Sequence, residues 1–174
     1  MLKLKSSRLT YINCTTDILE QVLLGDAYLA KYLNINIPER WTEFGESPFR
    51  YVLNKLDQDP DSVNWWGWFP ILISENMLVG NCGYKGPPLN GVVEIGYEVA
   101  ESYRGNGFAT EMAKALIDYA YSFPEVTMII AHTLPFENHS VSVLRKCGFE
   151  YAGAIEDPED GLIWKWEMNQ DRFG

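Results

Sequence analysis

VVEIGYEVAESYRGNGFATEMAKALIDY (residues 92–119) predicts a strand, a glycine-rich turn and an amphipathic helix, and the other segments are placed relative to it. The turn contains Gly105 and Gly107, which lack a Cβ and let the chain turn sharply. Backbone N–H groups are therefore left bare just before the N-terminus of a helix. Because the helix dipole adds positive potential there, the stretch predicts a site for an anion such as a phosphate.

Three interpretations of this turn are open from the stretch alone. The first is a tight strand-to-helix connection that binds nothing. The second is a dinucleotide site, since GNGFAT approximates the GxGxxG fingerprint. That fingerprint requires an acidic residue about 20 positions later, and the next predicted strand, TMIIAHTL, has none. The third is a phosphate site that acts together with the segments on either side.

Length and composition indicate one domain spanning residues 1–174. With 47% hydrophobic and 14% aromatic residues, the chain has enough apolar surface to form a core, which argues against disorder. No apolar run approaches the roughly 20 residues that span a bilayer. The N-terminal sequence MLKLKSSRLTY lacks the apolar stretch of a signal peptide. We therefore expect a cytoplasmic protein without a membrane partner.

The formal net charge of −10 argues against a nucleic-acid partner, because such binding depends on Lys and Arg neutralising phosphates. The same charge suits a cationic acceptor, and it also suits ordinary solubility. Cys14, Cys82 and Cys147 are far apart and lack the spacing of metal ligands. We expect them to be reduced thiols in packed or half-buried positions, and we expect no metal site. No pattern in the sequence indicates an oligomeric state.

The first third of the chain predicts a short strand followed by helices. Residues 9–12 are β-prone, and apolar residues at helical spacing follow and stop at Gly25. Asp26 begins a second helical segment, and Ser47-Pro48 supplies a cap and a first-turn proline for a third. This region contains no pattern of nucleophile and base. Its helices are candidates for one wall of a pocket.

A tryptophan-rich segment, WWGWFPILISENMLVGNCGYKG, predicts a hairpin around residues 74–76. Pro70 cannot donate a hydrogen bond to a neighbouring strand, so the paired part is expected to cover residues 71–74. The tryptophans are then expected at an edge or in a loop. They either pack in the core or line an acceptor pocket: Trp65, Trp66 and Trp68.

The C-terminal third predicts a strand, a helix and a hairpin. Residues 127–131 are continuously apolar, as in a strand that is covered on both faces. Strand, helix and strand in this order imply a right-handed parallel crossover. A short helix then ends at Gly148, and residues 149–155 and 162–168 form a hairpin across DPEDG.

Two segments resemble the GNAT acyltransferase superfamily. RGNGFA (residues 104–109) matches its R/Q-x-x-G-x-G/A signature, and AHTLPFENHSVSVLRKCGFE (residues 131–150) resembles its fifth strand and following helix. The second segment is similar in particular to the ribosomal-protein alanine acetyltransferase branch. The resemblance, over about residues 64–168, implies an α+β, single-domain GNAT-like fold. Its sheet is mixed and mostly antiparallel, with a central parallel β-α-β crossover and helices on both faces.

The same resemblance implies acetyl-CoA as co-substrate. Its pantetheine arm would lie between two strands that splay apart, and its pyrophosphate would lie on the glycine-rich turn. The residues that the resemblance assigns to cofactor binding are Val99, Arg104, Gly105, Asn106, Gly107, Phe108, Ala109 and Asn138.

Attack of an amine on a thioester needs a neutral amine and a proton for the departing thiolate. Glu94 lies where the superfamily has its general base, and Glu98 on the same strand face is the alternative. Ser140 is the expected proton donor, although a tyrosine often has that role in the superfamily. His132 and His139 flank the site and are expected to be structural.

Two classes of function are compatible with these residues. One is an N-acetyltransferase whose acceptor is a primary amine, with a protein N-terminus ranked above a small molecule such as a polyamine or an aminoglycoside. The other is a non-catalytic module that binds acetyl-CoA. The presence of both Glu94 and Ser140 favours the enzyme.

Overall fold

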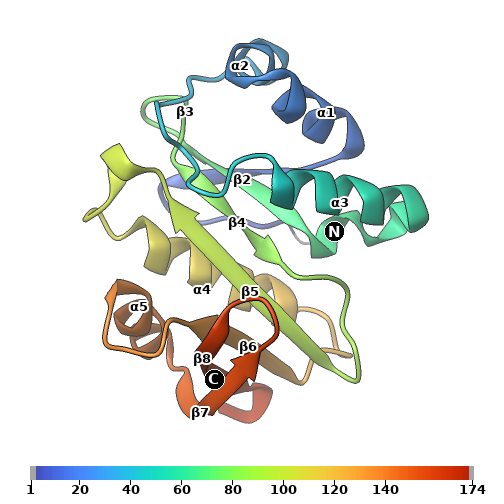
Figure 1. Cartoon of the computed structure of the whole chain (residues 1–174). Coiled ribbons are helices and arrows are strands. Elements are labelled where there is room, and N and C mark those ends of the chain that lie inside the picture. The colour runs from blue at the N-terminus through green and yellow to red at the C-terminus, as the bar shows by residue number, and fades with distance from the viewer. Residues whose placement is uncertain (1–2, 173–174) are drawn as a thin grey trace.

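Eight β-prone segments form one open sheet in the computed structural model, which describes residues 3–172 (Figure 1). The strands are β1 (Leu9–Asn13), β2 (Gly67–Leu72), β3 (Met77–Leu78), β4 (Gly80–Tyr84), β5 (Val92–Val99), β6 (Met128–Thr133), β7 (Glu150–Asp157) and β8 (Gly161–Asn169). Their order is β1-β2-β4-β5-β6-β8-β7, with β3 paired to β2. The β5–β6 pair is parallel and the other pairs are antiparallel, as predicted.

Helices cover both faces of the sheet. They are α1 (Thr16–Leu24), α2 (Asp26–Leu33), α3 (Ser47–Gln58), α4 (Phe108–Tyr121) and α5 (His139–Cys147). In Figure 1, α3 lies in front of the first half of the sheet and α4 passes behind β5. α4 connects β5 to β6, which confirms the predicted strand–helix–strand crossover.

The two faces have separate hydrophobic cores. The apolar side of α4, including the fully buried Met112 and Leu116, packs with α5 against side chains such as Ile129 and Trp166 of the sheet. On the other face, α1 to α3 pack against side chains such as Phe69. The side chains of a strand alternate between faces, so one strand contributes to both cores. β2 does so through Trp68 and Phe69.

The prediction that Pro70 breaks the first β-prone run was wrong. Pro70 lies inside β2, buried, opposite Tyr11 of β1. Its nitrogen points away from β1, toward β3 and β4. On that side the register shifts by one residue between the β2–β4 pair Trp68↔Cys82 and the β2–β3 pair Ile71↔Leu78. There its carbonyl accepts from the N–H of Val79 at 3.1 Å, an ordinary hydrogen-bond distance. Proline is tolerated because no donor is needed at this irregularity.

The cysteines are free, with Cys14 and Cys82 buried and Cys147 partly buried, as predicted. Within residues 3–172, no helix is both long and apolar enough to cross a bilayer. In the same part of the chain, no group of three or more His, Cys, Asp or Glu side chains is placed to hold a metal ion.

Gly80 of β4 makes the closest approach to β5. A Cβ at this position would overlap the carbonyl oxygen of Glu98, and backbone cannot move aside as a flexible side chain does. We predict that Gly80→Ala lowers the free energy of unfolding by about 3 kcal/mol, measured by urea titration. Gly96→Ala is the matched control, because a Cβ there meets only the Lys85 Cε at 3.8 Å. Equal urea midpoints for the two variants would contradict the prediction.

Candidate active site

The parallel ladder between β5 and β6 is short, and the two strands part at Glu94. Among the described residues the ladder ends at the pair Glu94↔Ile130. Beyond this pair, β5 continues against β4 as far as Val99, while β6 continues against β8. The predicted separation of the two strands is therefore confirmed. We call the opening between them the fork.

One edge of β5 faces the fork without a partner strand, although the Val99 carbonyl accepts from the Arg104 Nε at 3.3 Å. Lys85 donates its N–H to the Glu94 carbonyl at 3.0 Å, so the even-numbered residues of β5 bond toward β4. The odd-numbered residues Tyr97 and Val99 then direct their N–H and C=O groups toward β6, where no described residue is in register with them. An extended molecule with amide groups fits such an edge, because it can pair as a further strand does.

The turn after β5 presents a row of free N–H groups. Gly105 and Gly107 have φ values of 78° and 80°, and Gly107 is the N-cap of α4. In the described structure, no backbone acceptor is bonded to the N–H groups of residues 105–109. The N–H of Arg104 instead donates to the Glu101 carbonyl at 3.5 Å. The turn and the dipole of α4 therefore have the features expected of an anion site, without the N–H of Arg104.

Arg8 holds this turn in place from the start of the chain. Its Nε lies 2.7 Å from Glu111 Oε2 in the first turn of α4, and its Nη1 donates to the Asn106 carbonyl at 2.9 Å. The guanidinium also stacks on the Phe108 ring, 4.3 Å from the centroid. Partial burial raises the pKa of Glu111, but hydrogen bonds, including those from Arg8, outweigh it and lower that pKa. Glu111 therefore remains the anionic partner of Arg8.

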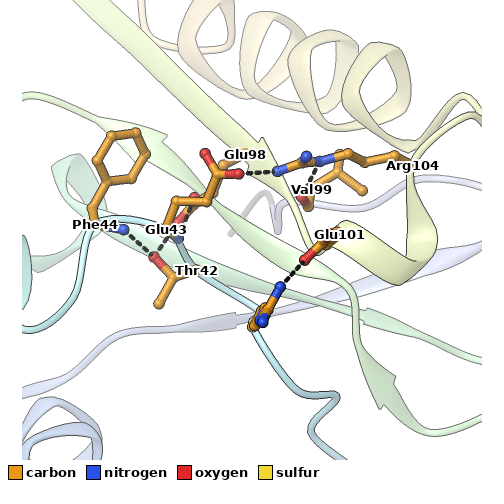
Figure 2. A network of polar contacts seen from close by, with 8 residues as sticks. Thr42, Glu43, Phe44, Glu98, Val99, Glu101 and Arg104 are labelled. Atoms are coloured by element: carbon orange, nitrogen blue, oxygen red, sulfur yellow. Dashed lines mark hydrogen bonds and ion pairs between the residues drawn. The ribbon is translucent and has the colours of Figure 1, made fainter.

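The Arg104 side chain points away from the anion site. Its Nη2 forms an ion pair with Glu43 Oε1 at 2.6 Å, and its Nε donates to the Val99 carbonyl at 3.3 Å (Figure 2). Glu98 lies beside this pair and accepts from the Thr42 hydroxyl at 2.5 Å and from the Glu43 N–H at 3.3 Å. These contacts connect β5 to the loop between α2 and α3.

Glu98 is held as a structural group in this network. Burial raises the pKa of Glu98, and the hydrogen bonds from Thr42 and Glu43 oppose that rise. Both oxygens of the Glu98 carboxylate have a donor in the loop, whereas the two contacts of Glu94 are both to its Oε1, so Glu98 is less free than Glu94 to contact a ligand.

Glu94 lies at the vertex of the fork, with two basic neighbours. Its Oε1 is 2.7 Å from Lys85 Nζ and 2.7 Å from His132 Nδ1, and its side chain is 20% exposed. The Nε2 atom of His132 is buried and has no hydrogen-bond partner among the described residues. His132 was expected to be structural, and its contact with Glu94 fixes the carboxylate at the point where the strands part.

Tyr97 faces the opposite side of β5 from Glu94 and lies next to the start of α5. Its hydroxyl donates to the Ser140 carbonyl at 3.3 Å. Burial raises the pKa of Tyr97, the Cys147 thiol adds to that rise, and a hydrogen bond with Ser140 opposes it. The phenol is therefore protonated at neutral pH. Ser140 and Tyr97 together place two hydroxyl groups on this side of the fork.

Asn138 is the N-cap of α5. Its Oδ1 accepts from the Val141 N–H at 3.0 Å, and its Nδ2 donates to the Phe136 carbonyl at 3.0 Å. Both ends of its amide are thus engaged in the cap, which fixes the position of Ser140 two residues later.

A hollow of about 650 Å³ lies beside Glu94 on the α3 side of the sheet. Its walls come from α3, from the loop after β4 and from the first residues of β5, and Ile130 of β6 also lines it. Trp66 is one of the lining residues, so one of the three tryptophans contacts the hollow. The other two pack in or against the α4 core: Trp65 and Trp68.

Sequence reasoning missed three residues of the site: Arg8, Lys85 and Tyr97. Arg8 and Lys85 act across the sheet, and their own neighbours in the sequence give no signal of it. Tyr97 was overlooked because a tyrosine was sought on the helix rather than on the strand. The alternation of VVEIGYEV does place it on the face opposite Glu94.

A mixed sheet that forks beside a glycine-rich turn with free N–H groups is typical of acyl-CoA-dependent acyltransferases. The sequence profile of the acetyltransferase (GNAT) domain matches residues 14–150. The chain therefore belongs to the GNAT acetyltransferase family and is an acetyl-CoA-dependent acyltransferase. This assignment agrees with the third interpretation of the glycine-rich turn.

Individual relatives support the assignment. An uncharacterised N-acetyltransferase, p20 of Bacillus licheniformis, is 32% identical over 137 residues, which cover 78% of this chain and 74% of the relative. A ribosomal-protein-S5-alanine acetyltransferase from Vibrio fischeri has the same fold, with a TM-score of 0.71, 14% identity and full coverage of both chains. Aminoglycoside acetyltransferase AAC(6')-Ib, solved with coenzyme A, gives a TM-score of 0.67 at 20% identity over 95% of this chain and 96% of that one.

We predict that Arg8→Ala weakens acetyl-CoA binding about tenfold, because the turn loses the cation that holds its Asn106 carbonyl and the first turn of α4. Isothermal titration calorimetry measures this change. Turnover at saturating acetyl-CoA should stay near the wild-type value. Arg50→Ala is the matched control, since Arg50 forms a comparable ion pair with Glu46 on the exposed side of α3. An unchanged dissociation constant for Arg8→Ala would contradict the role of Arg8.

Proposed function

We propose that this acetyltransferase acetylates a primary amine by direct attack of the amine on the thioester of acetyl-CoA. The observation that carries the proposal is the arrangement around the fork. Glu94 is on one face of β5, and Tyr97 with Ser140 is on the other. A base on one side and proton donors on the other suit a reaction in which the amine approaches from one face and the thiol leaves toward the opposite face.

The residues that would hold acetyl-CoA fit its two polar parts. The N–H groups of residues 105–109 suit the pyrophosphate, and the free edge of β5 near Val99 suits the amides of the pantetheine arm. Asn138 would contribute through its backbone position, since its side chain caps α5. When bound, acetyl-CoA supplies the acetyl group as an activated thioester.

Glu94 is the proposed general base and acts through a water molecule. Its carboxylate lines the hollow in which an acceptor would lie, and Lys85 and His132 orient it. Glu98 is the alternative base, but it is engaged by Thr42 and Glu43. Ser140 is the proposed proton donor to the thiolate. Tyr97 is the second hydroxyl within reach of the same position.

The acceptor is either a protein N-terminus or a small-molecule amine. The sequence resemblance to the alanine acetyltransferase branch favours the protein N-terminus. The structural similarity to AAC(6')-Ib, an aminoglycoside acetyltransferase, favours a small amine. A non-catalytic module that only binds acetyl-CoA is the alternative, and it predicts that no amine stimulates the release of coenzyme A thiol.

We predict that Glu94→Gln lowers kcat/KM by about 100-fold, because the amide keeps the shape of the side chain but cannot accept the proton. The assay is thiol release at saturating acetyl-CoA over a panel of amines. Glu98→Gln is the matched control on the same strand face and should lose less than about threefold. A larger loss in Glu98→Gln than in Glu94→Gln would transfer the role of base to Glu98.

We predict that Ser140→Ala lowers kcat by about tenfold or more and leaves the dissociation constant of acetyl-CoA unchanged, because the hydroxyl acts on the departing thiolate. Ser142→Ala is the control, since Ser142 is an exposed serine two residues after Ser140 in the same helix, α5. Tyr97→Phe is measured in parallel. If Ser140→Ala retains full turnover and Tyr97→Phe does not, the proton donor is Tyr97.

A further inference from the structure

The hollow beside Glu94 has a largely apolar wall. Its aromatic and aliphatic lining residues include Tyr51, Trp66, Pro87, Pro88, Leu89 and Ile130. Tyr51 is 56% exposed and Leu89 is 75% exposed. Large apolar side chains that are this open, and that gather around one hollow, indicate a surface made to be covered by a ligand.

Contacts with Ser62 and between the two rings fix the aromatic part of this wall, Tyr51 and Trp66. The Trp66 ring is buried, and its Nε1 donates to the Ser62 hydroxyl at 2.9 Å. Tyr51 packs edge-on against it, with 6.0 Å between ring centroids and 76° between planes. Gly86 leaves room over the same indole, since a Cβ there would lie 3.4 Å from its Cη2. The buried indole therefore fixes the exposed Tyr51 ring, and a flat ligand group can lie against that ring.

The charges around the hollow are balanced, although the chain as a whole carries −10. Two lysines and two carboxylates line it: Lys55, Lys85, Asp59 and Glu94. Lys85 and Glu94 already pair with each other at 2.7 Å, and the Lys55 Nζ lies 5.4 Å from the Tyr51 ring centroid. A ligand with several positive charges would meet two lysines here, whereas a single ammonium group can reach Glu94.

We propose that the acceptor carries one primary ammonium group on an apolar, and preferentially aromatic, body. The ammonium lies at Glu94, and the body covers the exposed Tyr51 and Leu89 side chains. The inference rests on the proposed function, because it names the acceptor of the same reaction. The ammonium first gives one proton to the base. The N–C bond then forms as the C–S bond breaks, and a second proton from nitrogen balances the thiolate as thiol.

The test compares four acceptors at saturating acetyl-CoA: 2-phenylethylamine, the dipeptide amide Phe-Gly-NH2, spermidine and kanamycin. We expect 2-phenylethylamine, Phe-Gly-NH2 or both to have a kcat/KM at least about tenfold higher than spermidine and kanamycin. Comparison of the first two then shows whether the acceptor amine belongs to a small molecule or to a peptide N-terminus. A preference for spermidine or kanamycin would overturn the proposal while leaving acetyl transfer intact.

Variants connect the preference to the hollow. Tyr51→Ala should raise the KM for the preferred acceptor about tenfold and leave that for acetyl-CoA unchanged. Tyr28→Ala, which removes a tyrosine of similar exposure from α2, is the control. Lys55→Glu should improve the KM for spermidine. Equal effects of Tyr51→Ala and Tyr28→Ala would overturn the assignment of the aromatic wall.

Binding without turnover separates this inference from the proposed function. Quenching of tryptophan fluorescence by 2-phenylethylamine, absent with spermidine and weakened in Tyr51→Ala, would support the hollow as the acceptor site even if no amine were acetylated. In that case acetyl transfer would fail and the class of ligand would stand. Absence of both quenching and transfer by 2-phenylethylamine and Phe-Gly-NH2 would overturn the inference.

Discussion

The early end of the β5–β6 ladder is the constraint on which the site depends. Backbone N–H and C=O groups that lose their partners in a sheet are costly unless water or a ligand satisfies them. Here the ladder stops at Glu94↔Ile130, and each strand keeps its other neighbour, β4 or β8. The sheet therefore stays intact as a whole while one internal edge is open. The anion-binding turn follows that edge directly in the sequence, so the two binding elements have a fixed separation.

The alternation of side chains along β5 divides the chemistry between two faces. Glu94 faces the hollow under α3, with Lys85 and His132, and Tyr97 faces α5. Because the two faces also have different hydrophobic cores, each proposed catalytic group lies beside its own set of packed residues. A substitution in one core can thus disturb one group and leave the other in place.

The sequence was sufficient for the fold and for the parts of the site that are local. The crossover, the glycine-rich turn before α4 and the end of the short helix at Gly148 each follow from a pattern within about 30 residues. Contacts between distant residues have no such pattern: Arg8 and Glu111 are 103 positions apart. The prediction for Pro70 was wrong because its missing N–H matters only on the side of β2 toward which the nitrogen points. The sequence does not show that the register of β2 with β3 and β4 shifts on that side.

The attachment of Arg8 to the anion-binding turn has a consequence for folding. The turn belongs to the middle of the chain, and its brace comes from the residue before β1, which joins the sheet at its outer edge. A contact of such long sequence separation costs loop-closure entropy, and it exists only while both segments are docked on the sheet. The binding turn is therefore completed only when the first strand has docked. Acetyl-CoA would then select molecules that have finished folding, and its binding energy would stabilise the whole sheet rather than one loop.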